Sequence, residues 1–300
     1  MKKKWTFILF GFATVPLLYS QPSTLRINQV HDIQFNSTPY HFAIIGDRTG
    51  EGSDPWTIFD SAIQQINDRE PDFVVMIGDL IQGGAHGDLA IQSRWQEALE
   101  HLEKLRRPLF MIPGNHDIDS RAAYEIWQRT IGNTYFSFIY GGNLFLFLNT
   151  EEDHAGHGQG FGKEQLAFIN ASLDSASVSE EIFIFMHRPP WLEKGSLSSQ
   201  WTAIKRKLEG KRFSLITGHL HVLGEKVDEG NRYLIVGPTG GKMRLSRNPG
   251  LGMVQHYTWV EVEKDTSYFQ FVENGLVHSE ENARASYARG VRTLRFLMSQ

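Results

Sequence analysis

Polar side chains that commonly bind metal ions recur in five short clusters along the chain. They supply two carboxylates, one amide and three imidazoles, and the sequence contains no cysteine: Asp47, Asp79, Asn115, His187, His219 and His221. Nitrogen and oxygen donors without sulfur suit manganese, iron, zinc, cobalt or nickel. Six donors exceed the four of a tetrahedral zinc site and suffice for two ions that share a carboxylate. The pattern predicts a centre of two divalent transition-metal ions.

One cluster, Gly114-Asn115-His116-Asp117, also carries a group that can move a proton. His116 offers a titratable imidazole, and Asp117 could orient that ring or cap the helix expected after it. Alone, this tetrapeptide is equally typical of a hydrogen-bonded turn. Each of the other clusters, taken alone, could also have a purely structural role, as a helix cap, a turn former or a loop histidine. The chemical interpretation therefore depends on whether all five clusters meet.

An apolar run precedes each cluster, and helical patterns separate several of these runs. The runs cover 41–45, 73–77, 108–112, 182–186 and 213–217, and the helical patterns cover 55–69, 89–105 and 163–173. Continuous apolar runs of this length are typical of buried strands in βαβ units. In open α/β sheets the carboxyl ends of the strands face a common crevice. We therefore expect the clusters to converge there.

The rhythm changes after residue 132. Residues 135–140 and 143–148 predict a hairpin around Gly141-Gly142. Further strands are expected at 232–236, 253–262 and 267–272, and a docked last helix at 283–298, for which a membrane-surface helix is the alternative. The strands fall into two groups, with helices between and outside them and no linker or repeat. This order predicts one α/β domain with two packed sheets.

The N-terminal sequence predicts export. Three lysines, a short apolar stretch and Ser20 give residues 1–20 the pattern of a signal peptide. An uncleaved membrane anchor is the alternative, but the stretch is short and contains Pro16, which favours cleavage. We expect a mature domain over residues 21–300, either periplasmic or secreted.

Composition restricts the partners of the mature chain. Without the three N-terminal lysines, 27 basic residues face 34 acidic ones, a formal net charge of −7. A chain of this charge offers no basic field for nucleic acid. No stretch after residue 20 is long and apolar enough to span a membrane, and disulfides are excluded because cysteine is absent.

Taken in order, the clusters resemble the five motif blocks of the calcineurin-like, or binuclear, metallophosphoesterases. The matching blocks lie within about residues 40–225: Gly46-Asp47, Gly78-Asp79, Gly114-Asn115-His116-Asp117, His187 and Gly218-His219-Leu220-His221. The resemblance implies a four-layer α/β/β/α sandwich of two mixed β-sheets flanked by helices, with the metals at the strand ends. It also implies hydrolysis of a phosphoric ester, so the expected partner is a small phosphoester substrate.

The same resemblance assigns roles to individual residues. Asp47 and His221 would bind the first metal, and Asp79 would bridge both metals. The second metal would be bound by Asn115, His187 and His219. His116 would serve the leaving oxygen, with Asp117 behind it, while a hydroxide that bridges the two ions attacks phosphorus in line.

The first block departs from the family pattern, which usually reads Asp-any-His. Here it reads Asp47-Arg48-Thr49, so the first metal lacks an imidazole. The purple acid phosphatase branch supplies a tyrosine three residues after the bridging aspartate, where this chain has Gln82. Gln82, a water molecule or His86 is expected to fill the gap. We predict that the first metal site is weaker than the second.

Several alternatives stay open. Arg48 and Arg188 adjoin predicted ligands, and each either grips a phosphate oxygen or pairs with the carboxylates of the site. Monoesters, diesters and pyrophosphates are all possible substrates. The rival from another class is a non-catalytic exported binding protein with a degraded first site, which Thr49 favours.

Two further features have weaker interpretations. Gly237-Pro-Thr-Gly-Gly-Lys242 is similar to a phosphate-binding loop, but it is one residue short, and Met243 stands where Ser or Thr should hold magnesium. We expect this loop only to border the crevice. His154 and His157 lie in a Gly-rich stretch that either reaches the site or forms a surface loop.

Overall fold

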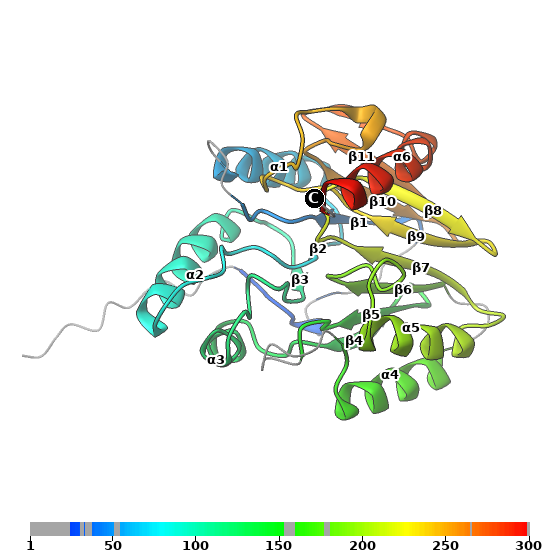
Figure 1. Ribbon diagram of the computed structural model, residues 1–300, viewed down its shortest axis with the longest axis horizontal. Helices are drawn as coiled ribbons and strands as arrows, with labels where there is room; N and C mark the ends of the chain where they lie inside the picture. Colours follow the sequence, from blue (N-terminus) through cyan, green and yellow to red (C-terminus); the bar gives the residue numbers. More distant parts are fainter. Residues whose placement is uncertain are drawn as a thin grey trace, which may run out of the picture.

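Two mixed β-sheets lie face to face in the computed structural model, and helices cover their outer faces (Figure 1). The structure describes residues 25–30, 33, 38–50, 55–152, 160–176, 181–264 and 266–298. The predicted signal peptide and the histidines at 154 and 157 lie outside these ranges. The predicted four-layer α/β/β/α architecture is confirmed.

The first sheet has six strands in the order β12-β11-β10-β1-β2-β3. In chain order these are β1 (Tyr40–Ile45), β2 (Phe73–Met76), β3 (Leu109–Met111), β10 (Tyr257–Val262), β11 (Ser267–Glu273) and β12 (Leu276–His278). Strands β1, β2 and β3 run parallel, and β10 pairs antiparallel with β1. The carboxyl ends of the three parallel strands therefore share one edge.

The second sheet has the order β4-β5-β6-β7-β9-β8. Its strands are β4 (Phe136–Tyr140), β5 (Asn143–Leu148), β6 (Glu181–Met186), β7 (Arg212–Thr217), β8 (Gly224–Asp228) and β9 (Asn231–Ile235). Strands β5, β6, β7 and β9 are parallel. The predicted hairpin is formed by β4 and β5, and its turn uses positive φ at both Gly141 (60°) and Gly142 (81°), as a tight hairpin turn requires.

Helices α1 (Pro55–Arg69), α2 (Asp88–Leu102) and α3 (Arg121–Thr130) pack on the outer face of the first sheet (Figure 1). Helices α4 (Lys163–Ser175) and α5 (Ser196–Lys207) pack on the second sheet. The last helix, α6 (Glu280–Met298), docks on β8 and on the short 3₁₀ turn Pro249–Leu251, as predicted. No helix in the described ranges is long and apolar enough to cross a membrane.

The core follows from the alternation of side chains along the strands. Phe42 and Phe73 point from the first sheet to Phe145 and Phe183 of the second, and all four side chains are fully buried. Their neighbours point outward to the helices. Burying one such aromatic ring stabilises the fold by about 1.5–3 kcal/mol. The strand ends that carry the polar clusters therefore emerge from a rigid layer of packed aromatic side chains.

Three segments differ from the sequence-based expectation. Helix α5 lies in a stretch for which no helix was expected, and only Tyr257–Val262 of the run 253–262 forms a strand. The residues before that strand pack against another loop, where the His256 N–H donates to the Pro238 carbonyl (3.0 Å). Residues 26–28, for which no strand pairing was expected, run beside β3, since the Asn28 N–H donates to the Leu109 carbonyl (2.9 Å).

Candidate metal centre

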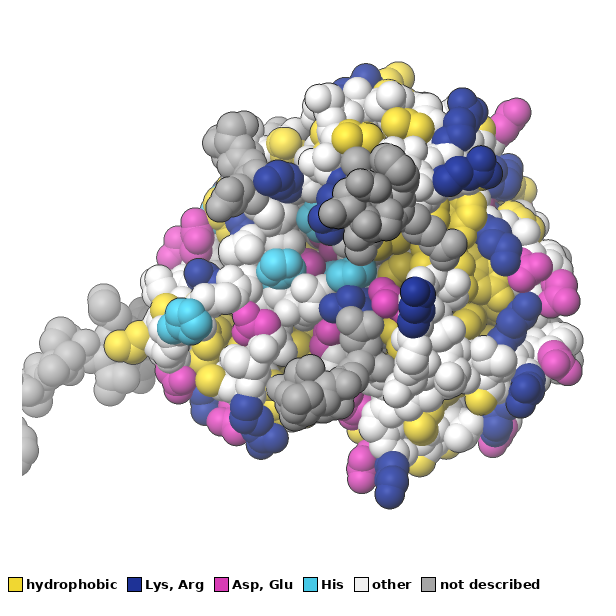
Figure 2. Space-filling view, viewed as in Figure 1, with side chains coloured by type: hydrophobic (Ala, Val, Ile, Leu, Met, Phe, Trp, Pro, Cys, Tyr) yellow, Lys and Arg dark blue, Asp and Glu magenta, His cyan; other side chains and the backbone are white. Residues whose placement is uncertain are grey.

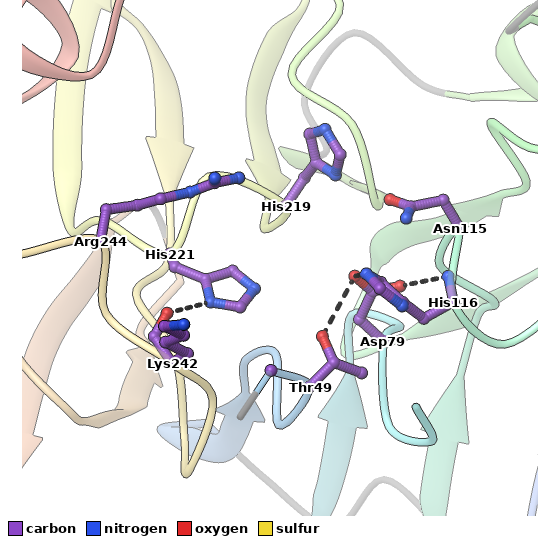
Figure 3. Close-up of a pocket in the computed structure, with 9 residues that line it drawn as sticks. Thr49, Asp79, Asn115, His116, His219, His221, Lys242 and Arg244 are labelled. Carbon is purple, nitrogen blue, oxygen red and sulfur yellow. Dashed lines mark hydrogen bonds and ion pairs between the residues drawn. The ribbon is translucent and has the colours of Figure 1, made fainter. Parts of the chain in front are cut away.

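The strand ends bring the predicted ligands together in two groups that share one carboxylate. Asp79, His219 and His221 from these groups are drawn in Figure 3. Asp79, His187 and His219 form one group, and Asp47, Asp79 and His221 form the other. Within each group the potential ligand atoms all lie within 4.8 Å of one another. This division matches the two sets that the resemblance implies, with Asp79 common to both. The ligand roles themselves remain predictions.

Backbone carbonyls orient two of the imidazoles. His187 Nδ1 lies 2.9 Å from the Ile77 carbonyl oxygen, and His221 Nδ1 lies 2.6 Å from the Lys242 carbonyl oxygen. Because a carbonyl only accepts, each Nδ1 carries the hydrogen and each neutral ring keeps the Nε2 lone pair. His187 Nε2 lies 3.3 Å from Asp79 Oδ2, and His221 Nε2 lies 3.6 Å from Asp47 Oδ1. Metal-binding histidines are typically oriented in this way.

The predicted amide ligand lies beside the second group. Asn115 Oδ1 is 3.2 Å from His187 Nε2, and Asn115 lines the same cavity as Asp79 and His219 (Figure 3). A neutral carbonyl oxygen therefore joins the carboxylate and the imidazoles, which is a donor set suited to a divalent transition metal.

Charge is concentrated among these buried groups. Burial raises the pKa of Asp47, although His221 and His187 oppose the effect. Burial acts in the same direction on Asp79, but His187 and His116 outweigh it and hold the pKa of Asp79 below its usual range. For His187, burial is outweighed by the Asp79 and Asp47 carboxylates, which raise its pKa to about 10. At neutral pH the His187 ring is therefore protonated beside the two carboxylates, and a metal ion bound there would take the place of its Nε2 proton.

Three of the predicted ligands have unusual backbone conformations. Asp79, His219 and His221 have φ angles of 56°, 69° and 54°, in the left-handed region. Each such residue costs on the order of 1 kcal/mol and persists only where surrounding contacts impose it. One such contact is the His219 N–H, which donates to Asp47 Oδ1 (3.0 Å). Strained residues of this kind cluster at functional sites.

Glycines in the motifs give the carboxylates the room they occupy. A Cβ atom on Gly114 would lie 2.2 Å from Asp79 Oδ1, and one on Gly218 would lie 2.5 Å from Asp47 Oδ2. Both distances are far inside van der Waals contact. The glycines therefore belong to the site because any side chain would displace a predicted ligand.

His116 lies at the edge of the cavity with its side chain about one-third exposed. Its Nδ1 accepts a hydrogen bond from the Gly83 N–H (3.2 Å). The neutral ring must then carry its proton on Nε2, which lies 4.0 Å from Asp79 Oδ2. His116 therefore presents an N–H donor on the side of the predicted bridging carboxylate.

Asp117 differs from the expectation that it stands behind the His116 ring. Its carboxylate instead accepts four backbone N–H groups, at 2.7–3.0 Å, from Asp79, Leu80, Ile81 and Gly114. Burial and the nearby Asp79 raise its pKa to about 7, and the backbone donors oppose that rise. Asp117 thus fixes the turn that carries Asp79, and it acts on the site through the backbone.

Thr49 stands where the family pattern would supply the first group with a second imidazole. Its Oγ1 lies 3.5 Å from Asp79 Oδ2, and the side chain is buried in the wall of the cavity. The side-chain oxygen of Gln82, Oε1, accepts a hydrogen bond from the Gly50 N–H (2.8 Å), so Gln82 holds this loop. His86 is exposed and does not line the cavity. Neither Gln82 nor His86 is among the described residues that line the cavity.

The two predicted substrate-binding arginines have structural partners. Arg48 Nε donates to the Leu80 carbonyl (2.6 Å), and its guanidinium stacks 4.1 Å from the Trp56 ring centre. Arg188 pairs with Glu151 (2.6 Å) and contacts His219 Nε2 through Nη1 (2.8 Å). Glu151 is not one of the predicted metal ligands, so contact between Arg188 and a phosphate oxygen stays a prediction. Arg188 also orients His219.

Burial, together with the neighbouring His187 and Arg188, holds the pKa of His219 well below its usual range. The ring is therefore neutral, which is the form that binds a metal.

The cavity above the predicted ligands has a volume of about 350 Å³. Histidine side chains gather near the middle of the face of the molecule drawn in Figure 2. The residues that line the cavity are Thr49, Gly50, Asp79, Asn115, His116, His219, His221, Lys242 and Arg244. Lys242 ends the loop that was expected to border the crevice, but neither Lys242 nor Arg244 was predicted as a site residue. Lys242 and Arg244 follow β9, which is parallel to β7. Polar residues that follow parallel strands converge at one edge of a sheet, so the apolar run 232–236 is the signal in the sequence that indicates this position.

Comparison with known proteins agrees with this geometry. A family model described as calcineurin-like phosphoesterase matches residues 30–223. Human serine/threonine-protein phosphatase CPPED1 is 31% identical over 162 residues, which cover 47% of this chain and 49% of that protein. The 3',5'-cyclic adenosine monophosphate phosphodiesterase CpdA of Escherichia coli (strain K12) is 24% identical over 217 residues, which cover 69% of this chain and 73% of CpdA. The chain spans about a third to a half of the CPPED1 phosphatases it matches.

Solved structures share the fold at low identity. A dimetal phosphatase from Danio rerio superposes with a TM-score of 0.59 at 16% identity, covering 81% of this chain and 99% of that one. GAP50, described as the anchor in the inner membrane complex of Plasmodium, superposes with a TM-score of 0.57 at 16% identity and covers 86% and 94%. With the family match extending over more than half of the sequence, the motif order and the two sheets have one explanation: the chain belongs to the calcineurin-like phosphoesterase family.

Proposed function

We propose that this protein hydrolyses phosphoric esters of small molecules at a centre of two divalent transition-metal ions. The observation that carries the proposal is the pair of ligand groups that share Asp79, at the base of a polar cavity that His116 also lines. Phosphatases and a phosphodiesterase among the relatives support it. Metal ions held there would lower the pKa of bound water and offset charge on the phosphoryl group.

Residues of the chain would donate the proton and position the ligands. His116, with its proton on Nε2, is placed to donate to the leaving oxygen, while the Gly83 N–H holds its other nitrogen. Arg188 orients His219, and Asp117 fixes the turn of Asp79. Proton donation from such a side chain contributes roughly 10²–10⁴-fold to a rate.

Replacement of His116 tests its role. We expect His116→Ala to lower kcat by about 10²–10³-fold, because the leaving oxygen loses its proton donor, while two metals stay bound. The measurement is turnover of a chromogenic phosphomonoester and phosphodiester with added manganese, alongside elemental analysis of the protein. Loss of metal from the variant would show instead that His116 is a ligand.

A binding protein with a degraded site is the second candidate, and Thr49 is the observation that favours it. The fold also occurs in GAP50, so architecture alone does not decide between the two. The same assay separates them. Failure to hydrolyse either ester with two metals bound would favour the binding protein, whereas turnover of one ester supports the enzyme.

Export to the periplasm or beyond the cell is part of the proposal, supported by the lysines and the apolar stretch within residues 1–20. N-terminal sequencing of protein recovered from fractionated cells tests it. A mature chain that begins near residue 21 is the expected result, and an intact chain retained in the cytoplasm would contradict it.

A further inference from the structure

Lys242 and Arg244 extend into the cavity from the segment between β9 and β10. Figure 3 shows both side chains on one side of the cavity, with Asn115 and His116 on the opposite side and Thr49 between them. The two cations therefore face the predicted proton donor across the space that a substrate would occupy.

The segment that carries these cations is fixed to the loops of the site. The Thr239 and Gly241 N–H groups both donate to the Asp47 carbonyl (2.9 and 3.1 Å), and the Lys242 N–H donates to the Thr49 carbonyl (2.9 Å). The Lys242 carbonyl in turn accepts from His221 Nδ1 (2.6 Å). The positions of the two charges are thus set by the same backbone that positions the predicted ligands of the first metal.

Neither cation forms an ion pair or a side-chain hydrogen bond with any described residue. This lack of a partner in the described part of the chain distinguishes Lys242 and Arg244 from two arginines nearby. Arg188 pairs with Glu151, and Arg247, on the same segment, pairs with Glu273 through Nε (2.8 Å) and Nη2 (2.6 Å). Lys242 and Arg244 are also exposed, so their charges are open to a ligand that enters the cavity.

The lining of the cavity indicates what kind of ligand that is. It consists of polar and charged side chains and one glycine, with no apolar side chain among its described residues. A phosphodiester carries one negative charge on phosphorus and would place a second organic group in this polar space. A phosphomonoester carries about −1.5 to −2 at pH 7 and presents only bare oxygens there.

We infer that Lys242 and Arg244 bind the non-bridging oxygens of a terminal phosphoryl group, so that the site selects dianionic phosphomonoesters over monoanionic diesters. The inference rests on the proposed phosphoesterase function. The leaving oxygen faces His116, and the oxygens farthest from it face the two cations. Arginine and lysine both form charge-assisted hydrogen bonds with phosphoryl oxygens.

The kinetic test compares p-nitrophenyl phosphate with bis(p-nitrophenyl) phosphate. In the double variant Lys242→Gln/Arg244→Gln, we expect kcat/KM for the monoester to fall about 10- to 100-fold, since two charge-assisted hydrogen bonds are lost. The diester should change less than about threefold. Arg247→Gln is the matched control: it removes one positive charge from the same segment outside the cavity and should leave the monoester-to-diester ratio unchanged.

A binding measurement separates this inference from the activity. Calorimetric titration of the metal-loaded protein with inorganic phosphate and with dimethyl phosphate should show that the double variant weakens phosphate binding about tenfold or more, with dimethyl phosphate nearly unaffected. Lys242→Arg/Arg244→Lys should retain most of the phosphate affinity. Equal losses for both anions, or no loss for phosphate, would overturn the inference.

The two proposals fail in different ways. A wild-type protein that hydrolyses neither ester refutes the proposed function, and the phosphate titration then still decides whether Lys242 and Arg244 recognise the second charge. A wild-type protein that hydrolyses both esters, with a ratio unaltered by the double variant, keeps the function and refutes the inference.

Discussion

Thr49 is the residue at which this chain departs most clearly from its family's motif. It borders the group formed by Asp47, Asp79 and His221, and its hydroxyl lies 3.5 Å from Asp79. A threonine hydroxyl is a weaker ligand for a transition metal than an imidazole. The first group therefore offers fewer strong donors than the second, which has two imidazoles and the nearby Asn115.

Restoring the imidazole should strengthen the first site. We expect Thr49→His to raise the affinity of the more weakly bound metal by about tenfold, an effect comparable in size to that of a supporting residue in a metal site. Titration with manganese against a competing chelator measures both affinities. Unchanged stoichiometry and unchanged affinity of the weaker site would show that Thr49 leaves no gap.

The sequence identified the donor types but not all of their partners. Asp79, His187 and His219 could be chosen because their chemistry is evident and each follows an apolar run. The partners of Asp117 and Arg48 could not be chosen in this way, because backbone N–H and carbonyl groups carry no residue identity. Residues that act through the backbone are for this reason poorly predicted from sequence.

The turns after the parallel strands determine where the donor atoms lie. The turn after β7 contains Gly218 and then His219, whose N–H binds the Asp47 carboxylate. Gly218 has an ordinary φ, but a Cβ atom there would lie 2.5 Å from Asp47 Oδ2. This turn tolerates no side chain for a reason of contact and not of backbone conformation.

Gly218→Ala should therefore weaken metal binding without unfolding the protein. We expect the first site to lose affinity by about 10- to 100-fold as Asp47 is displaced, with a smaller change at the second site. Isothermal titration and thermal melts of the metal-free protein give the two quantities. Gly250→Ala is the control, because its Cβ atom would meet only Asn248 Oδ1 at 3.4 Å; equal losses in both variants would contradict this account.

Element type was predictable where one pattern dominated. The strands around the aromatic core are continuous apolar runs, and the Gly141-Gly142 turn has a direct conformational cause. Helix α5 was missed although Leu197, Trp201 and Ile204 have helical spacing and are buried. Two prolines and Gly195 precede it, and their loop signals concealed the start of the helix.

At the scale of the whole molecule, His256 links stability to pH. Its side chain is buried, packs edge-on against Phe271, and lies outside the metal groups. Burial lowers its pKa from 6.5 to about 4. Between these values the unfolded chain binds a proton that the folded chain does not, so the free energy of unfolding falls as pH falls.

The size of this effect is about 3 kcal/mol between pH 6.5 and pH 4. Urea denaturation of the metal-free protein should show a smaller decline over this range for His256→Gln than for the wild type, by roughly that amount. The decline in each protein is measured from its own free energy of unfolding at pH 8, which removes the pH-independent effect of the substitution on packing. Parallel declines in the two proteins would mean that His256 is already charged in the folded state.

The strand order of the first sheet has a consequence for the time at which the centre can form. Strand β1 lies between β2 and β10, and the Asp47 carbonyl is held by Thr239 and Gly241. Synthesis proceeds from the N-terminus. The segment that braces Asp47 also carries both cationic side chains, and it emerges after every predicted ligand. Long-range pairings of this kind also form late in folding. We therefore expect a metal ion to be bound by the complete site only after this late segment has packed against the Asp47 loop, so the ions present where folding finishes would determine which metal is acquired.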